Sequence, residues 1–365
     1  MKVCHMTSAH SQEDVRIFHK ECVSLANAGF EVYLVERGDS YDKKGVHIIG
    51  VGEIPVSRIK RMTQGAKKVY EKALALDCDI YHFHDPELLP YGLKLKKKGK
   101  KVIFDSHENT SIMFEEKDYL PGFIRKTLGR AYAAYEKSIC SRLESVVTVT
   151  PTQTDYFKKI NHNTVEVTNY PIFSEDYCEP SFKKKAVAFA GGISRQWNHE
   201  MIVRALEEVP GCTFILCGPD NEYRKGLESL PAWNQVEYKG KIPHIEVARV
   251  LSECMVGMAL LTPGLNTAWN IGTIGNTKIF EEMMAGLPVI CTDFVLWREF
   301  VDRYRCGICV DPTSKTDVVS AMQTLLSDPV AAKKMGQNGR YAVQEEFNWS
   351  TQEIKLIELY RGLEG

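Results

Sequence analysis

The chain has 365 residues, 44% of them hydrophobic, which is enough for two ordinary domains that each bury a core. Its formal net charge of −1 gives no general basic field, so the composition argues against nucleic acid as a partner. The eleven cysteines are scattered among apolar strand residues, which favours reduced thiols and a cytoplasmic location. No run of about 18 apolar residues occurs, so the sequence predicts no membrane-spanning helix.

Short apolar strands alternate with helical patterns along the whole chain, which is typical of α/β folds with parallel sheets. In the first half we predict strands at 3–6, 32–35, 47–51, 80–84, 102–105 and 146–150, and helices at 14–27, 56–76, 87–97 and 123–143. After a polar stretch at 174–184, strands are expected at 187–190, 213–217, 236–238, 256–260, 289–292 and 308–310. Helices are expected at 318–326, 331–346 and 351–363. The pattern fits two doubly wound sheets in tandem better than one large sheet.

Ligands of open parallel sheets bind beyond the carboxyl ends of the strands, and several polar residues of the first half lie there. His82 and His84 share one face of a predicted strand, with Asp85 and Glu87 just beyond, so zinc ligation by this segment is sterically feasible. His107 follows the next strand, where an imidazole can donate to a ligand hydroxyl or hold a developing charge. A plain surface-loop histidine is the alternative.

Three further polar residues follow the first strand. His10 lies in the first turn, and Asp14 and Arg16 begin the first predicted helix. An aspartate in a first helical turn is also explained by the helix dipole alone.

In the second half, two glycines follow the strand at 187–190. Gly191 and Gly192 would let backbone amides approach a phosphate, which Arg195 could then neutralise. An ordinary strand-to-helix turn with an exposed arginine is the alternative. Gly218 and Ile242 occupy the corresponding turns after the next two strands.

The segment from 272 to 291 combines a helix start with a cation and a carboxylate. Gly275 frees the backbone, and Asn276 is placed to cap a helix that begins at Thr277. Lys278 and Glu281 are three residues apart and therefore share a helical face. First-turn amides and an ammonium group suit a diphosphate, and the carboxylate suits ribose hydroxyls. A capped amphipathic helix with a solvated ion pair is the alternative.

The sequence from Asn276 to Ile290 resembles the nucleotide-sugar site of retaining glycosyltransferases with the GT-B fold, in the large family-4 group. Glu281 matches the family glutamate that holds the ribose. Thr273 stands where the family has another glutamate, whereas Asn276 and Lys278 resemble a common variant of that region.

The resemblance also gives the other motifs a meaning. It implies that Arg195 contacts phosphate, that Gly218 lies beside the nucleotide and that the backbone at Ile242 faces the nucleobase. It places His107 at the active-site histidine near the transferred sugar. Similar strand-end histidine segments occur in the family without a metal, so no metal is expected. The acceptor-side candidates are then His10, Asp14, Arg16, His84 and Asp85.

For the whole chain, the resemblance implies a GT-B fold of two Rossmann-like domains facing across a cleft. Residues 1–178, with 350–365 packing back on them, form the acceptor domain, and residues 179–349 form the nucleotide-sugar donor domain. The expected reaction is retaining sugar transfer from a UDP- or GDP-sugar, without metal or cofactor, in polysaccharide or lipid-linked saccharide synthesis. The basic and aromatic stretch at 119–126 suggests peripheral contact with the inner face of a membrane.

Two other functions fit the same architecture. A non-hydrolysing sugar-nucleotide epimerase would need an acid–base pair, for which His82, Asp85 and Glu108 are candidates. A non-catalytic sugar-nucleotide-binding partner protein is the other alternative, because Thr273 replaces a family glutamate.

Overall fold

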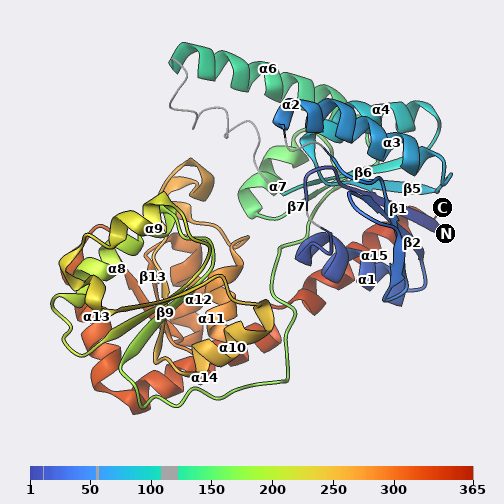
Figure 1. Ribbon diagram of the computed structural model, residues 1–365. Coiled ribbons are helices and arrows are strands. Elements are labelled where there is room, and N and C mark those ends of the chain that lie inside the picture. The colour runs from blue at the N-terminus through green and yellow to red at the C-terminus, as the bar shows by residue number, and fades with distance from the viewer. Residues whose placement is uncertain (11, 55–56, 108–121, 365) are drawn as a thin grey trace. The chain divides into compact units, whose positions relative to one another are not determined.

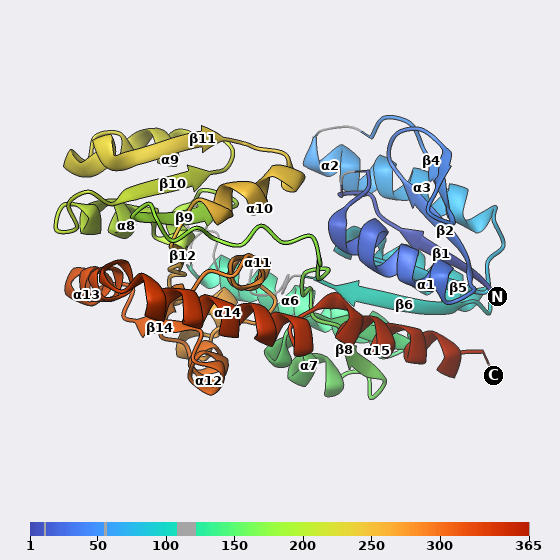
Figure 2. The same cartoon turned by 90° about the horizontal axis from the view of Figure 1, so that it is seen from below.

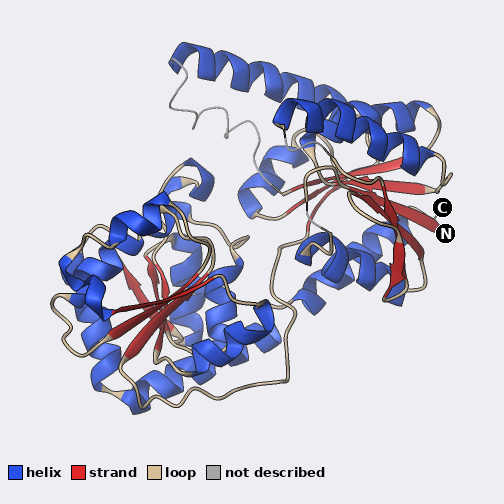
Figure 3. Cartoon of the chain, in the orientation of Figure 1, coloured by secondary structure: helices blue, strands red, loops and turns tan. Residues whose placement is uncertain are grey.

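The computed structural model describes residues 1–10, 12–54, 57–107 and 122–364. The chain divides into two compact units, which are described separately below: unit 1 is Met1–Asn169 with Trp349–Gly365, and unit 2 is Tyr170–Asn348. Each unit is an α/β domain around one mostly parallel sheet, which confirms the predicted fold class (Figure 3). Glu108 and the stretch 119–121 lie outside the described residues.

Unit 1 contains an eight-stranded sheet in the order β3-β4-β2-β1-β5-β6-β7-β8. The strands are β1 (Lys2–Met6), β2 (Glu31–Glu36), β3 (Tyr41–Lys43), β4 (Val46–Gly50), β5 (Ile80–Phe83), β6 (Lys101–Ser106), β7 (Ser145–Thr148) and β8 (Thr164–Glu166). Every neighbouring pair is parallel except β3 with β4. The two strands that the sequence did not predict, β3 and β8, are three residues long and lie at the sheet edges.

Helical segments cover both faces of this sheet (Figure 1). One face carries α2 (Arg58–Lys60), η2 (Arg61–Gly65), α3 (Ala66–Leu74), η3 (Pro86–Leu88), α4 (Leu89–Lys97), α6 (Gly122–Cys140) and α7 (Pro151–Lys158). The other face carries the π-helix η1 (Val15–Cys22), α1 (Val23–Asn27) and α15 (Trp349–Gly362). Strand side chains alternate between these faces: Val3 packs on the second layer, and Cys4 and Met6 pack on the first.

The helix α15 returns from the far end of the chain to complete unit 1. It lies against η1, α1 and β8 (Figure 2). Trp349 Nε1 donates a hydrogen bond of 2.8 Å to Ser24 Oγ, and Leu356 and Tyr360 are fully buried. The last helix is therefore part of the core of the first unit.

Unit 2 contains a six-stranded, fully parallel sheet in the order β11-β10-β9-β12-β13-β14. Its strands are β9 (Ala186–Ala190), β10 (Thr213–Cys217), β11 (Val236–Gly240), β12 (Val256–Ala259), β13 (Val289–Thr292) and β14 (Gly307–Val310). Its helical segments are η4 (Arg195–Trp197), α8 (His199–Leu206), α9 (Glu222–Leu227), η5 (Pro231–Gln235), α10 (His244–Ser252), η6 (Leu265–Thr267), η7 (Trp269–Ile271), α11 (Thr277–Met284), α12 (Val295–Tyr304), α13 (Lys315–Ser327) and α14 (Pro329–Glu345).

The core of unit 2 is divided by its sheet into a large and a small layer. On β9, Val187 and Phe189 face the large layer, and the alanines between them face the small layer under α10. The helices α11 and α14 meet at Gly336, where an added Cβ would lie 1.9 Å from the carbonyl oxygen of Gly286. That contact leaves no room for a side chain.

In each unit, the sheet reverses its strand order beside the first strand of that unit. β1 lies between β2 and β5, and β9 lies between β10 and β12. Such reversal points open a crevice at the carboxyl ends of the strands, where ligands of doubly wound sheets bind. Among the residues that the structure describes, no helix has the length and hydrophobicity needed to cross a membrane.

Candidate functional site

The reversal point of unit 2 brings a glycine turn next to the start of a helix. Gly191 follows β9, and α11 follows the loop that leaves the adjacent β12. The side chain of Lys278 lies over Gly191, since an added Cβ on that glycine would be 3.0 Å from both Lys278 Cδ and Cε. The structure therefore places together two elements that the sequence separates by 87 positions.

The start of α11 leaves its first amides without a side-chain cap. Asn276 occupies the N-cap position, but its side chain makes no capping hydrogen bond, so the expected cap is not formed. Immediately upstream, Thr273 Oγ1 accepts a hydrogen bond of 3.2 Å from the Gly275 amide. The helix begins at Thr277 with the partial positive charge of its N-terminus directed toward the crevice.

A largely buried ion pair follows within the first turn and a half of α11. Lys278 Nζ lies 2.8 Å from Glu281 Oε2, and the two side chains are 27% and 16% exposed. The pair therefore presents an ammonium and a carboxylate side by side at the edge of the crevice. A ligand with phosphates and hydroxyl groups could engage both.

The neighbouring strand ends complete the floor of this site. Gly218 follows β10, and a Cβ there would lie 2.2 Å from the carbonyl oxygen of Gly191, so only glycine fits. Gly192 is exposed and an added Cβ would meet nothing within 4 Å. Ile242, after β11, is half-buried and packs against the small core layer.

Arg195 occupies a different environment from Lys278. Its guanidinium lies over the ring of Tyr223, 5.2 Å from the ring centroid, and the residue is exposed. The structure shows no contact between Arg195 and Lys278 among the residues it describes. In this structure Arg195, which we expected to contact phosphate, is thus stacked on Tyr223.

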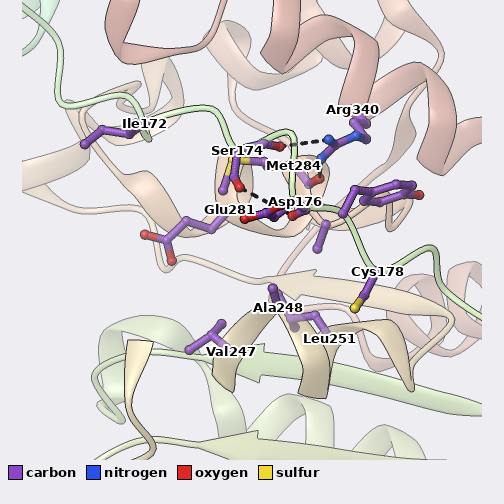
Figure 4. A pocket seen from close by; sticks show the side chains of 12 residues that line it. Ile172, Ser174, Asp176, Cys178, Val247, Ala248, Leu251, Glu281, Met284 and Arg340 are labelled. Carbon is purple, nitrogen blue, oxygen red and sulfur yellow. Dashed lines mark hydrogen bonds between the residues drawn. The ribbon is translucent and has the colours of Figure 1, made fainter. Parts of the chain in front are cut away.

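A pocket of about 500 Å³ opens beside Glu281 (Figure 4). Its walls come from the segment after Tyr170, from α10, from the face of α11 that carries Glu281 and from α14. The other lining residues are Ile172, Ser174, Asp176, Tyr177, Cys178, Val247, Ala248, Leu251, Met284, Ala285 and Arg340. Arg340 donates to the carbonyl oxygens of Met284 (2.6 Å) and Ser174 (2.8 Å), which fixes the first of these walls. Pockets of this size hold small-molecule ligands.

This pocket could not be predicted from the sequence, because its lining residues come from four distant segments without a shared motif. Only Glu281 was a candidate.

In unit 1, the corresponding reversal point is filled by the protein's own carboxylate. Asp85, after β5, accepts hydrogen bonds from Thr7 Oγ1 at 2.9 Å and from the amides of Ser8 and Ala9, in the turn after β1. Burial alone would raise the pKa of Asp85, but its hydrogen bonds with His10 and with the Ser8 amide lower it to about 2. Asp85 thus occupies the place where an anionic ligand would bind, and it is not free to contact an acceptor.

Two other acceptor-side candidates have structural roles. Arg16 is buried, and its Nε and Nη2 donate to Asp105 at distances of 2.9–3.1 Å. Burial would raise the pKa of Asp105, yet the charge of Arg16 holds it well below its usual range. Asp14 caps η1 by accepting from the amides of Arg16 (2.9 Å) and Ile17 (3.1 Å). The prediction that Arg16 is available to an acceptor is wrong, because the ion pair buries it.

His107 lies just beyond β6, with its side chain 16% exposed. Its Nε2 is 2.9 Å from His84 Nδ1 and 3.4 Å from Asp105 Oδ2. Burial lowers the pKa of His107 well below its ordinary value despite the Asp105 charge, so the imidazole is neutral at pH 7. The ring of His10 stacks on the His107 ring, with 5.3 Å between the two ring centroids.

The two histidines of β5 and its end point inward. His82 and His84 are 0% and 2% exposed, and His82 Nδ1 lies 2.7 Å from the Tyr360 hydroxyl. His84, which we expected on the acceptor side, is therefore not exposed to an acceptor. His84 still reaches the crevice indirectly, through its contact with His107.

Comparison with known protein families identifies both halves of the chain. The model described as glycosyl transferases group 1 matches residues 179–342, and the model described as glycosyltransferase family 4 matches residues 16–169. No curated protein sequence matches the chain. Together the two matches, one in each unit, support a family-4-like glycosyltransferase.

Solved structures confirm the GT-B fold of this glycosyltransferase. Sucrose-phosphate synthase from Thermosynechococcus elongatus superposes with a TM-score of 0.77 at 19% identity, covering 99% of this chain and 98% of that one. The Anabaena HepE protein, solved in complex with UDP and glucose, gives 0.74 at 13% identity, with coverage of 99% and 100%. WaaG, a glycosyltransferase involved in lipopolysaccharide biosynthesis, gives 0.70 at 14% identity, with coverage of 98% and 99%.

In this glycosyltransferase, most donor-side candidates of unit 2 lie around the reversal point, whereas Ile242 follows the edge strand β11 and Arg195 stacks on Tyr223. Of the acceptor-side candidates in unit 1, Arg16, His84 and Asp85 are buried, whereas His10 and Asp14 are partly exposed. The catalytic candidate His107 is partly exposed as well. Asp105 was not among the predicted site residues, although its position at a strand end after an apolar run is a signal that the sequence contains.

Proposed function

We propose that this glycosyltransferase transfers a sugar from a nucleoside-diphosphate sugar to an acceptor hydroxyl with retention of configuration. The observation that carries the proposal is the packing of Lys278 across Gly191 at the reversal point of unit 2, directly beside the uncapped start of α11.

The diphosphate would bind where these groups meet. Amides at a helix start and an ammonium group stabilise negative charge without moving, and the charge on the leaving diphosphate grows in the transition state. Lys278 and α11 would therefore provide the main stabilisation, and Arg195 would have to turn away from Tyr223 to assist. We propose that no metal or cofactor is needed at the diphosphate, because these groups supply the positive charge.

The nucleoside would extend from the diphosphate toward Glu281. Its carboxylate is placed to accept hydrogen bonds from ribose hydroxyls once a phosphate competes for Lys278. The pocket next to Glu281 has apolar walls from α10, including Val247 and Leu251, which suit the faces of a nucleobase. The backbone at Ile242 would meet the base edge. UDP and GDP are the two carriers we propose to test first.

His107 would contact the transferred sugar as a neutral imidazole. A neutral ring can donate a hydrogen bond to a sugar hydroxyl without placing a second cation next to the leaving group. The departing phosphate would take the acceptor proton, with attack on the face from which it leaves. The HepE structure with UDP and glucose supports a nucleotide-sugar donor for this fold.

We propose a saccharide or lipid-linked saccharide as acceptor, in polysaccharide assembly on the cytoplasmic side. The likeness to WaaG, which is involved in lipopolysaccharide biosynthesis, supports this class. Exposed Phe123 (75%) and Leu128 (42%) lie on α6 near Arg125 and Lys126, a composition that suits peripheral contact with an anionic membrane surface.

The positions of the acid–base candidates argue against the epimerase alternative. His82 and Asp85 are buried and hydrogen-bonded, so they do not form an accessible acid–base pair, and Glu108 lies outside the described residues.

Incubation of the protein with radiolabelled nucleotide sugars and saccharide acceptors tests the proposal. Release of nucleoside diphosphate that depends on the acceptor, with an NMR spectrum showing the donor's anomeric configuration in the product, would support it. A changed donor sugar without release would indicate epimerisation, and tight binding without turnover would indicate a non-catalytic binder.

The role of His107 can be tested separately. We expect His107→Ala to lose about 100-fold or more in turnover, a usual effect for a group acting on the reacting sugar, and to keep nucleotide affinity within about twofold. Steady-state kinetics and titration calorimetry on the same preparation measure the two effects. Full activity in the variant would remove His107 from the chemistry.

A further inference from the structure

Four metal-ligand side chains of unit 1 form a buried cluster that the proposed transfer does not use. They are His5 on β1, Glu21 on η1, His82 on β5 and His84 just past β5, and each is at most 2% exposed. Each residue offers one donor atom, and these four atoms lie within 4.8 Å of one another.

We propose that this cluster binds one divalent transition-metal ion, with Zn²⁺ as the best fit. Imidazole nitrogens and a single carboxylate oxygen are ordinary zinc ligands, and structural zinc sites are four-coordinate and closed to water. Three neutral imidazoles and one carboxylate would leave the bound ion with a single net positive charge, next to the Asp105 carboxylate.

The spacing of three of the donor atoms, those of His5, Glu21 and His84, is close to that around a tetrahedral ion. Zinc–nitrogen bonds of about 2.0–2.1 Å place tetrahedral ligand atoms roughly 3.3 Å apart. His5 Nδ1 lies 2.9 Å from His84 Nε2, and Glu21 Oε2 lies 3.8 Å from each of these nitrogens. The three imidazole rings also lie close together, with centroids separated by 4.6, 4.7 and 5.2 Å.

Two of the four ligands have buried polar atoms without a hydrogen-bond partner in the described structure. Neither carboxylate oxygen of Glu21 accepts a hydrogen bond, and His82 Nε2 has no partner. Arg16 Nε is 3.0 Å from Glu21 Oε1, but it donates its hydrogen to Asp105. Unsatisfied polar atoms are costly in a core, and a cation between Glu21 Oε2 and the imidazoles would satisfy Glu21 Oε2 and His82 Nε2.

The outer contacts of the histidines fit a metal centre too. The Tyr360 hydroxyl lies 3.1 Å from His5 Nε2 and 2.7 Å from His82 Nδ1, and His84 Nδ1 lies 2.9 Å from His107 Nε2. In metal sites, the second imidazole nitrogen is held by such a partner, which fixes the ring and the tautomer. A metal on His84 Nε2 would leave its Nδ1 protonated and able to donate to His107.

The helix that supplies Glu21 is a π-helix, a form that occurs often at functional sites. The site differs from the zinc arrangement considered from the sequence, in which Asp85 and Glu87 were the carboxylates. Here Asp85 bonds the turn after β1, and Glu21 takes its place. The site also lies in unit 1, so it does not alter the metal-free diphosphate site proposed for unit 2.

Metal analysis of the purified full chain, with any affinity tag removed, tests the proposal. After chelator treatment and gel filtration we expect about one zinc ion per chain, because a closed site exchanges slowly. Protein produced in Co²⁺ medium should show the visible absorption of tetrahedral Co²⁺. Glu21→Gln and His82→Gln should lose the ion, whereas His47→Gln, which removes an exposed histidine paired with Asp42, should keep it.

Folded wild-type protein from zinc-supplemented medium with less than about a tenth of an equivalent of metal, and no cobalt absorption, would overturn the proposal. The short His5–His84 contact would then be a hydrogen bond. Because the wild-type measurements decide the question, variants that fail to fold do not weaken the test. UDP and GDP titrations of the same samples report on unit 2, so failure of the nucleotide site and failure of the metal site are distinguishable.

Discussion

Lys278 and Glu281 have the geometry of an ordinary helical ion pair, and a second pair of unit 2 provides the comparison. Lys225 and Glu222 are also three residues apart, with a distance of 2.9 Å, but their side chains are 51% and 91% exposed. Exposed pairs of this kind contribute little to stability. What distinguishes Lys278 is its contact with Gly191 and its place at the start of α11.

We expect Lys278→Ala and Glu281→Ala each to weaken UDP or GDP binding by about 10-fold to 100-fold, the range for losing one hydrogen bond to a charged group. Lys225→Ala should leave the affinity unchanged. Titration calorimetry measures all three, and circular dichroism checks that the variants fold. Unchanged affinity in both site variants would show that the nucleotide binds elsewhere.

At the residue scale, the sequence predicted best where a side chain acts on its immediate neighbours. The Lys278–Glu281 spacing and the strand-end position of His107 both appear in the structure as expected. The roles of Arg16 and His84 could not be predicted, because their burial depends on distant partners. Arg16 pairs with a residue about 90 positions away, and His84 contacts residues of η1 and β1. Arg195 could not be predicted either, since its stacking on Tyr223 follows from the position of α9.

At the element scale, α14 and α11 are held together by a contact between glycines. We expect Gly336→Ala to destabilise unit 2 by about 3 kcal/mol, because the new methyl group would collide with the Gly286 backbone and force the helices apart. Gly226→Ala on α9 is the control: an added Cβ there meets nothing within 4 Å, so the variant should be about 0.5–1 kcal/mol more stable. Thermal unfolding of both variants measures the difference, and equal melting temperatures would contradict the packing argument.

The helix α6 carries a buried acid whose titration should be visible in stability. Burial raises the pKa of Glu136 to about 7, although a hydrogen bond from Tyr156 opposes the shift. The folded state therefore binds this proton more tightly than the unfolded chain does. The stability that the protonated carboxyl contributes is complete below about pH 4.5 and is lost as the pH rises through 7.

Glu136→Gln should accordingly stabilise the protein above pH 7 and have little effect at pH 4.5. A shift of this size corresponds to roughly 3 kcal/mol at pH 8. Urea unfolding at the two pH values measures the difference, with the exposed Glu71→Gln as control. An equal effect at both pH values would point to packing and not to ionisation.

Strand and helix periodicity predicted most elements, because buried parallel strands are short apolar runs between amphipathic helices. The strands β3 and β8 were not predicted, because each is an edge strand of only three residues. The helix α7 had a usable signal that the prediction overlooked: Thr150 caps it, and Pro151 is its first residue. The π-helical turn of η1 leaves no distinct trace in the periodicity.

For the whole molecule, the assignment of α15 to unit 1 has a testable result. Removing residues 349–365 would expose the core around Leu356 and Tyr360 and delete the Trp349 hydrogen bond. Burial of the side chains of Trp349, Leu356 and Tyr360 contributes on the order of 5 kcal/mol to the free energy of unfolding, which approaches the stability of a domain.

We therefore expect the truncated chain to lose hydrogen-exchange protection in β1 and β2 while β9 and β10 stay protected. A chain lacking only residues 364–365 should behave like the wild type. Equal protection of both units after the longer truncation would show that α15 is dispensable for unit 1.

The position of α15 also determines the order in which the chain can mature during its synthesis. Tyr360, whose hydroxyl contacts His5, is added to the chain 355 residues after that histidine. Unit 2 is complete before that helix exists, so the unit that is begun first is finished last. Until then, the apolar face of the nascent sheet that α15 will cover is open to chaperones and proteases.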